Sequence, residues 1–356
     1  MISLIYYECK KIFGNFKWLI LVGIILVKAV ITYASLNVSA DFSIDVYKDY
    51  VDQLSHMSQT DAELFVPKEA ERIEEIMGAK EKMESDYASG AISLDDYKAY
   101  MKKYYEADSK RSAFTVIQTR YEQFFGIDRS ERVWFYDLEW RAFGNMLSLD
   151  FCLLFALFIF CIPVYCREHS SGVHMLNMVS KNGRVKLHIA KLSVIIISSL
   201  LYALLIYSVD FAVMGAKFGF ENFDKPLRAM IDHGSAYDSM PILKFFVLQS
   251  LAKTLWAVCA ALSLGVISVI AKNIVISTVV SAAFILIPVV TVPTDSKLNN
   301  YCIGVGLKGS KYHVNLLTPL ANILIWLAVT IAVMLILYPI HKKCTKSAVQ
   351  KNKFGA

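Results

Sequence analysis

The chain has 356 residues, of which 56% are hydrophobic and only 19% are charged, and its formal net charge is +6. Its mean hydropathy is +0.45. This composition excludes an ordinary soluble enzyme, because apolar stretches of about 20 residues are typical of helices that cross the roughly 30 Å hydrocarbon layer of a membrane. The sequence therefore predicts an all-α membrane protein.

The first predicted element is an amphipathic helix over residues 2–16, expected to lie on the inner membrane surface. Its apolar side chains recur at helical spacing, at Ile2, Ile5, Cys9, Ile12, Phe13 and Phe16. With the first span it forms the region 1–37. Six spans are predicted in all, over residues 18–37, 146–166, 192–215, 245–271, 273–293 and 320–341. Only Lys272 and Asn273 separate the fourth span from the fifth, which indicates a tight hairpin.

The segment 38–145 is expected to form an extracellular helical domain. It contains 14 basic and 22 acidic residues, and 14 − 22 gives −8. The polar stretches expected on the same side as the N-terminus are basic, with only Glu8 and Glu168 opposing their lysines and arginines, and lysine and arginine favour the cytoplasmic side. Both termini are therefore predicted to be cytoplasmic, including the basic tail 342–356. The positive total reflects this inner face opposite anionic membrane lipid, so it does not indicate a nucleic-acid partner.

Within the outer segment, two helices are expected to form an antiparallel hairpin. Asp61 or Thr60 caps the first helix in this interpretation, and Ser89-Gly90 ends it. Ser93 and Asp96, three residues apart, form a capping box for the second helix. Beyond it, Trp134, Tyr136 and Trp140 are predicted to approach the membrane, where amphipathic aromatic rings are favoured.

Between the second and third spans lies a polar, basic stretch with three histidines, His169, His174 and His188. Their spacing of 5 and 14 residues disfavours a shared metal, because helical ligands usually lie three or four residues apart. A short helix over 167–183 is expected instead. Ser170 or Ser171 caps it, and Asn182-Gly183 ends it. Val173, Leu176 and Val179 form its apolar stripe.

Motifs for catalysis or cofactor binding are missing from the sequence. It has no GxxxxGK[ST] phosphate loop, no HExxH and no GxSxG. The stretch GVGLKG at Gly304–Gly309 matches GxGxxG, but it falls in a predicted outer loop, so these glycines are expected to form turns. We therefore expect no enzyme activity, no cofactor and no metal.

Three short patches resemble the permease subunits of type-2 ATP-binding-cassette exporters. The run Glu168-x₃-Gly172-x₃-Leu176-x₃-Ser180-x₃-Arg184 is similar to the cytoplasmic segment after their second span. Tyr7–Lys11 (YECKK) resembles their N-terminal interfacial helix. Leu316–Leu324 (LLTPLANIL) resembles the start of their sixth span. The outer insertion departs from this family, whose first outer loop is short, and this departure puts the class of cargo in doubt.

The resemblance implies that residues 146–356 hold spans 2–6 and a coupling helix that docks a separate ATPase subunit. It also implies a second permease copy or related chain, the two together forming the pathway of an ATP-driven exporter. Cargo of peptide, lipid-like or drug-like type is compatible with it. The expected coupling residues are Glu168, Ser171, Gly172, Val173, Leu176, Val179, Ser180 and Arg184. Glu168 is expected near the N-terminus of this helix, where the helix dipole favours a negative charge.

Four charged residues fall inside predicted spans, namely Lys28, Asp150, Asp210 and Lys253. A charge at the centre of a membrane helix costs roughly 2.5–3.5 kcal/mol on insertion scales. These residues are therefore expected to face the bundle interior, either as ion pairs or along a polar pathway, with Lys28 paired to Asp210 or Asp150. The alternative function is a non-transporting sensor or scaffold whose outer domain binds a ligand or partner.

Overall fold

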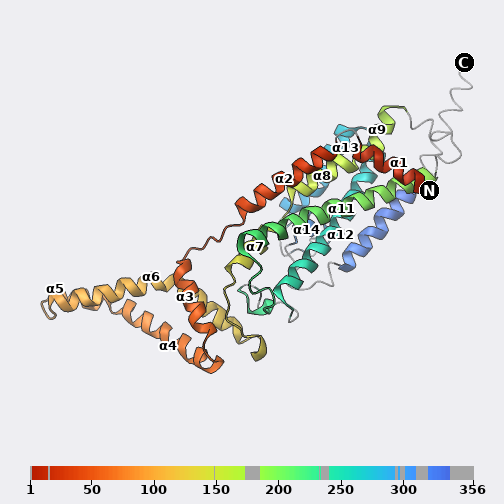
Figure 1. Cartoon of the computed structure of the whole chain (residues 1–356). Coiled ribbons are helices and arrows are strands. Elements are labelled where there is room, and N and C mark those ends of the chain that lie inside the picture. The colour runs from red at the N-terminus through yellow and green to blue at the C-terminus, as the bar shows by residue number, and fades with distance from the viewer. Residues whose placement is uncertain are drawn as a thin grey trace, which may run out of the picture. The chain divides into compact units, whose positions relative to one another are not determined.

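The structure is a computed structural model that describes residues 2–14, 17–147, 149–172, 185–231, 233, 240–292, 296, 301–309 and 320–336. Throughout these residues the regular secondary structure is helical (Figure 1). The chain divides into two compact units. Unit 1 contains residues 1–35, 145–219 and 246–356, and unit 2 contains residues 36–144 and 220–245.

Five helical segments are long and apolar enough to cross a membrane, as in an integral membrane protein. They are Lys17–Ser35, Leu138–Ser170, Lys186–Phe218, Ile242–Ala271 and Ile274–Thr291. Each overlaps one of the first five predicted spans. A shorter apolar helix, Leu320–Ile336, falls in the predicted sixth span, and residues 337–341 lie outside the described part of the chain. The sixth span therefore stays a prediction.

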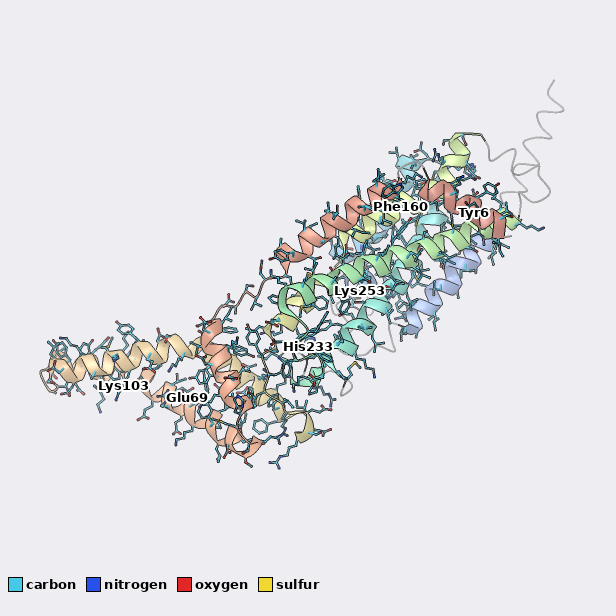
Figure 2. All side chains as sticks on the ribbon, in the orientation of Figure 1. Tyr6, Glu69, Lys103, Phe160, His233 and Lys253 are labelled. Carbon is cyan, nitrogen blue, oxygen red and sulfur yellow. The ribbon has the colours of Figure 1, made fainter. Side chains whose placement is uncertain are left out.

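Unit 1 is a bundle of apolar helices. Its elements are α1 (Ile2–Phe13), α2 (Lys17–Ser35), α8 (Phe151–Cys161), α9 (Pro163–Ser170), α11 (Val185–Phe218), α12 (Ile242–Ala271), α13 (Ile274–Thr291), α14 (Ile303–Lys308) and the helix at 320–336. α11 packs against α1, α2 and α8. Phe160, Tyr202 and Trp256 are buried in its core, and Figure 2 shows Phe160 and Lys253 among the helices.

The hairpin predicted between the fourth and fifth spans is confirmed. α12 ends at Ala271, and Lys272 has a positive φ of 57°. Asn273 then caps α13, its side chain accepting hydrogen bonds from the backbone N–H groups of Val275 and Ile276. The connection between the two helices is therefore confined to Lys272 and Asn273.

Two of the three glycines of GVGLKG do not form turns, contrary to the expectation from the sequence. Gly304 and Gly306 lie inside α14, and only Gly309, with φ 74°, ends a helix. α14 packs on α13 so closely that a Cβ on Gly304 would collide with the Ile285 carbonyl oxygen. A Cβ on Gly306 would collide with the ring of Trp256. Close helix packing explains why glycine occupies positions 304 and 306, and the GxGxxG pattern does not predict this packing.

Replacing Gly304 with alanine is expected to lower the free energy of unfolding by about 1–3 kcal/mol, because backbone atoms must shift to admit the methyl group. Gly23→Ala is the matched control. It lies within α2 with no atom near its would-be Cβ, and alanine there gains up to about 1 kcal/mol of helix propensity. Thermal unfolding of the purified protein in detergent measures both. Equal stability of the two variants would contradict the α13–α14 packing.

Unit 2 contains a helical hairpin that confirms part of the sequence analysis. Its elements are α3 (Ile44–Ser55), α4 (Gln59–Gly78), α5 (Lys80–Ala88), α6 (Leu94–Phe124), η1 (Arg129–Glu131), most of α7 (Leu138–Met146) and η2 (Leu227–Ala229). α4 and α5 return along α6 (Figure 1). Ser93 caps the second helix as predicted, because its Oγ accepts from the Asp96 N–H at 3.2 Å and donates to Asp96 Oδ2 at 2.7 Å. The first helix begins earlier than predicted, with Ser58 rather than Thr60 or Asp61 as its N-cap.

Three features of unit 2 were not predicted. α3 packs on α6 as an additional helix. Residues 220–245, which the sequence analysis left among spans 2–6, belong to this unit. Trp140 is fully buried within the unit, and its Nε1 donates to the Glu221 carbonyl at 2.8 Å. The indole is enclosed by 220–245, a segment far away in sequence.

Candidate functional site

The four predicted intramembrane charges are brought together in unit 1. Lys28 on α2 places its Nζ 2.6 Å from Asp150 Oδ2 and 2.8 Å from Asp210 Oδ1. The expected pairing of Lys28 is therefore found with both aspartates. The side chains are 9%, 6% and 1% exposed, in the order Lys28, Asp150, Asp210. An ammonium between two carboxylates compensates charges that would be costly when isolated in an apolar bundle.

Local structure holds both carboxylates in place. Asp150 is the N-cap of α8, and its Oδ1 accepts from the Leu153 N–H at 3.0 Å. Asp210 on α11 accepts from the Thr32 hydroxyl at 2.8 Å. Thr32 follows Lys28 by four residues, so both side chains project from the same face of α2. Thr32 was not predicted from the sequence, although its spacing of four residues from Lys28 on an apolar helix was the available signal.

Lys253 on α12 completes the group. It is fully buried, and its ammonium donates to the carbonyl oxygen of Leu147, three residues before Asp150, the N-cap of α8. It also interacts electrostatically with Asp150 and Asp210. Two lysines and two aspartates sum to zero charge. The arrangement joins α2, α8, α11 and α12 by polar contacts, and we call these four residues the intramembrane cluster.

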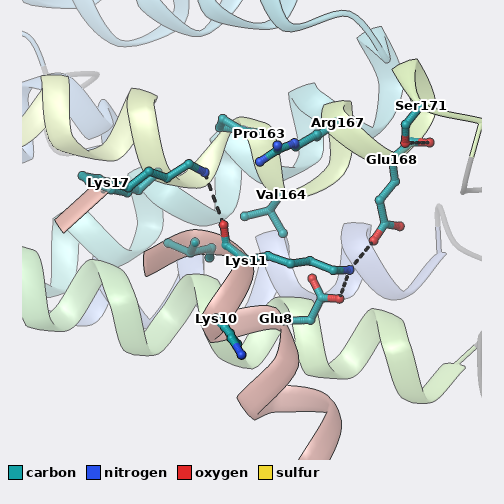
Figure 3. Close-up of a pocket in the computed structure, with 11 residues that line it drawn as sticks. Glu8, Lys10, Lys11, Lys17, Pro163, Val164, Arg167, Glu168 and Ser171 are labelled. Carbon is teal, nitrogen blue, oxygen red and sulfur yellow. Dashed lines mark hydrogen bonds and ion pairs between the residues drawn. The ribbon is translucent and has the colours of Figure 1, made fainter. Parts of the chain in front are cut away.

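A second charged group joins α1, α9 and α11. Lys11 Nζ lies 2.6 Å from Glu8 and 3.1 Å from Glu168, and Lys191 Nζ lies 2.6 Å from the other oxygen of Glu168. Figure 3 shows Glu8 and Glu168 converging on Lys11. Burial lowers the pKa of Lys11, but the two carboxylates outweigh it and the pKa is raised overall. We call these residues the Glu168 cluster.

The Glu168 cluster extends into the bundle through aromatic contacts. Lys191 Nζ lies 4.9 Å from the centre of the Tyr165 ring. The Tyr165 hydroxyl is 3.2 Å from His188 Nδ1, and His188 Nε2 is 3.2 Å from the Met334 carbonyl oxygen. His188 is thus hydrogen-bonded between two segments of unit 1. Within the described residues, no group of three or more His, Cys, Asp or Glu side chains has the spacing of a metal site.

The position of Glu168 differs from the expectation. It lies in the last turn of α9, which continues from the second span through Ser170, and not at the start of a new helix. Ser171 is the C-cap of α9, and Gly172 follows with φ 71°. Nothing in the sequence stops the helix before this glycine. The dipole at Glu168 is therefore unfavourable, and Lys11 and Lys191 stabilise the carboxylate instead.

The rest of the predicted coupling helix falls outside the described residues. This applies to Val173, Leu176, Val179, Ser180 and Arg184, and to His174. Of the predicted coupling residues, the structure describes Glu168, Ser171 and Gly172. Glu8 and Lys191 were missed as ion-pair partners, although the spacing of Glu8 and Lys11 by three helical residues was a usable signal. Comparison of the chain with protein families, curated proteins and solved structures finds no match.

Proposed function

We propose that this chain is the membrane-spanning permease subunit of an ATP-driven exporter. In this proposal six spans cross the cell membrane, both termini are cytoplasmic and residues 38–145 are extracellular. Two copies, or this chain and a related one, form the pathway, and a separate ATPase subunit drives it. The cargo is peptide, lipid-like or drug-like. The chain itself hydrolyses no ATP.

The observation that carries the proposal is the double attachment of Glu168. Glu168 lies four residues before Gly172, which precedes residues 173–184 in the chain. Its two carboxylate oxygens contact Lys11 of α1 and Lys191 of α11. A force applied to the segment after α9 is therefore transmitted to α1 and α11 together. An exporter needs such a rigid link, because its ATPase works outside the membrane while its pathway lies within it.

The intramembrane cluster also supports transport. Charged side chains within spans are rare, and they commonly mark substrate or ion routes in membrane proteins. Here they occupy α2, α8, α11 and α12 together. A change in the packing of these helices changes the distances between opposite charges, so the cluster is placed to favour one arrangement of the bundle over another.

The decisive experiment is purification of the protein from its native membrane together with its ATPase. The double variant Glu168→Gln/Arg184→Gln is expected to retain about tenfold less ATPase than the wild type, a loss of about 1.4 kcal/mol of binding free energy. Lys103→Gln, an exposed position on α6 of unit 2 (Figure 2), is the control and should retain all of it. Size-exclusion chromatography checks that each variant remains folded.

The alternative, a sensor or scaffold, is favoured by one feature of unit 2. This unit has its own buried core and exposes large side chains, such as Leu64, Tyr105 and Phe125. Such a surface is suited to binding a ligand or a partner. The same purification separates the two functions. If the wild-type protein never associates with an ATPase, the exporter proposal is wrong and the sensor function is preferred.

A further inference from the structure

A pocket of about 280 Å³ lies where α1, α2 and α9 meet in unit 1. Its size is near the lower limit of small-molecule sites, roughly 300 Å³. Its apolar lining comes from Ile12, Phe160, Pro163 and Val164. The charged side chains around it are labelled in Figure 3. The pocket therefore combines an apolar wall with a charged rim, as a ligand with a polar head and an apolar body requires.

The rim carries more positive than negative charge. It contains four cations, Lys10, Lys11, Lys17 and Arg167, and two carboxylates, Glu8 and Glu168. The difference of 4 − 2 is +2. Both carboxylates are already engaged by Lys11, and Glu168 is engaged by Lys191 as well. The carboxylates therefore leave the remaining rim cations uncompensated.

Three rim cations remain besides Lys11, and two of them, Lys17 and Arg167, repel each other. Lys17 donates to the Lys11 carbonyl oxygen at 3.3 Å, and its charge is repelled by Arg167. Across the part of the chain that the structure describes, no ion pair within 4.0 Å joins either of them to a carboxylate. The neighbouring stretches 15–16 and 173–184 contain no Asp or Glu. An anion supplied from outside the chain would relieve this repulsion.

We propose that this pocket binds the phosphate group of an anionic membrane lipid between Lys17 and Arg167. Arginine binds phosphate through two parallel N–H donors, and lysine adds a point charge. The glycerol and upper acyl carbons contact the apolar wall. Trp18 beside Lys17 is 53% exposed at the start of α2, and exposed tryptophan at the end of a span is favoured at the membrane–water interface. Free phosphate shares the anionic chemistry but leaves the apolar wall unused.

This inference requires only that the spans cross a membrane, so it is independent of the exporter function. Lipid binding also has a structural consequence. The phosphate joins the start of α2 to the end of α9, next to the Glu168 cluster. Occupation of the pocket therefore holds the start of α2 against the end of α9.

The test is native mass spectrometry of the full-length protein released from nanodiscs of equal phosphatidylglycerol and phosphatidylcholine. The wild type is expected to retain phosphatidylglycerol about tenfold over phosphatidylcholine. Both lipids carry the phosphate, but the net positive rim also repels the quaternary ammonium of phosphatidylcholine, which phosphatidylglycerol lacks. Lys17→Gln/Arg167→Gln should abolish the preference. Lys186→Gln/Lys272→Gln removes two cations from the predicted cytoplasmic side that do not line the pocket. This control variant should keep the preference for phosphatidylglycerol. If both double variants lost the preference for phosphatidylglycerol equally, the preference would come from the overall surface charge and not from the pocket, and the proposal would be overturned.

Two further measurements complete the test. Displacement of phosphatidylglycerol by inorganic phosphate at equal concentration would overturn the lipid assignment, because the apolar wall would then contribute nothing. The second measurement uses the wild-type protein alone, so it does not depend on the folding of a variant. Phenylglyoxal modifies accessible arginines, and Arg167 is expected to be protected in phosphatidylglycerol nanodiscs and modified in phosphatidylcholine nanodiscs. Equal modification in both would contradict the site.

Discussion

Replacing Lys28 with methionine is expected to destabilise unit 1 by about 3–5 kcal/mol, because Asp150 and Asp210 then remain buried without their shared cation. The two carboxylates are 6% and 1% exposed and both contact the Lys28 ammonium, so neither can reach water without moving a helix. Under the exporter proposal, transport is lost as well. Thermal unfolding in detergent measures the first effect, and efflux from cells measures the second.

A second substitution distinguishes charge from packing at this site. Lys28→Met/Asp210→Asn leaves one lysine and one aspartate in the intramembrane cluster, so its formal charge is again zero. It should recover about half of the lost stability, because the remaining Asp150 carboxylate still accepts a hydrogen bond from the Leu153 N–H. Lys186→Met, an exposed lysine at the start of α11, is the control. If Lys28→Met leaves expression, assembly and transport unchanged, the ion pair has no structural role.

Arg120→Met is expected to have the largest effect in unit 2, about 3–5 kcal/mol, because it breaks a fully buried charge network. Arg120 is 0% exposed and lies 3.7 Å from Asp137. Its guanidinium donates to the carbonyl oxygens of Phe135 and Ala229, both at 2.8 Å. Asp137 in turn accepts from Tyr47 and from the Ile231 N–H. Arg120 therefore links α6 and the residues that precede α7 to the segment 220–245.

Limited proteolysis of the full chain in detergent reports this loss. Cleavage is expected to accelerate in both 36–144 and 220–245, because they share the network. Arg111→Met is the matched control, since Arg111 is an exposed residue nine positions earlier on the same helix, and its loss should change stability by less than about 0.5 kcal/mol. If the two variants were cleaved at the same rate, Arg120 would not hold the unit together.

Local signals were the most reliable guide to the helices. The N-cap at Ser93, the break at Ser89-Gly90 and the short connection at Lys272-Asn273 are all found. Each depends on a few neighbouring residues, and backbone sterics and hydrogen bonding decide it within one turn. The role of Ser170-Ser171 was harder to predict, because a serine can end a helix as well as begin one. Only the structure showed that α9 runs to Ser170 and that Ser171 is its C-cap.

Contacts between distant segments could not be predicted in the same way. The position of Trp140 before the predicted second span gave no sign that its indole would be fully buried and donate to the Glu221 carbonyl. Gly304 and Gly306 have the spacing of a turn motif, yet they serve close packing on Ile285 and Trp256. In each case the residue type allowed two environments. The choice between them depended on a partner segment that the chain brings close only on folding.

The sequence by itself determined the apolar helices, the buried position of Lys28 and its need for an aspartate, because hydrophobicity and the cost of an isolated charge act whatever the partner. The tertiary structure decided that Lys28 binds both Asp150 and Asp210, and that Thr32 and Lys253 join them. It also decided that Glu168 joins α1 to α11. These partners lie more than a hundred residues from Lys28 or Glu168 in most cases, and only the packing of the helices brings them within hydrogen-bonding distance.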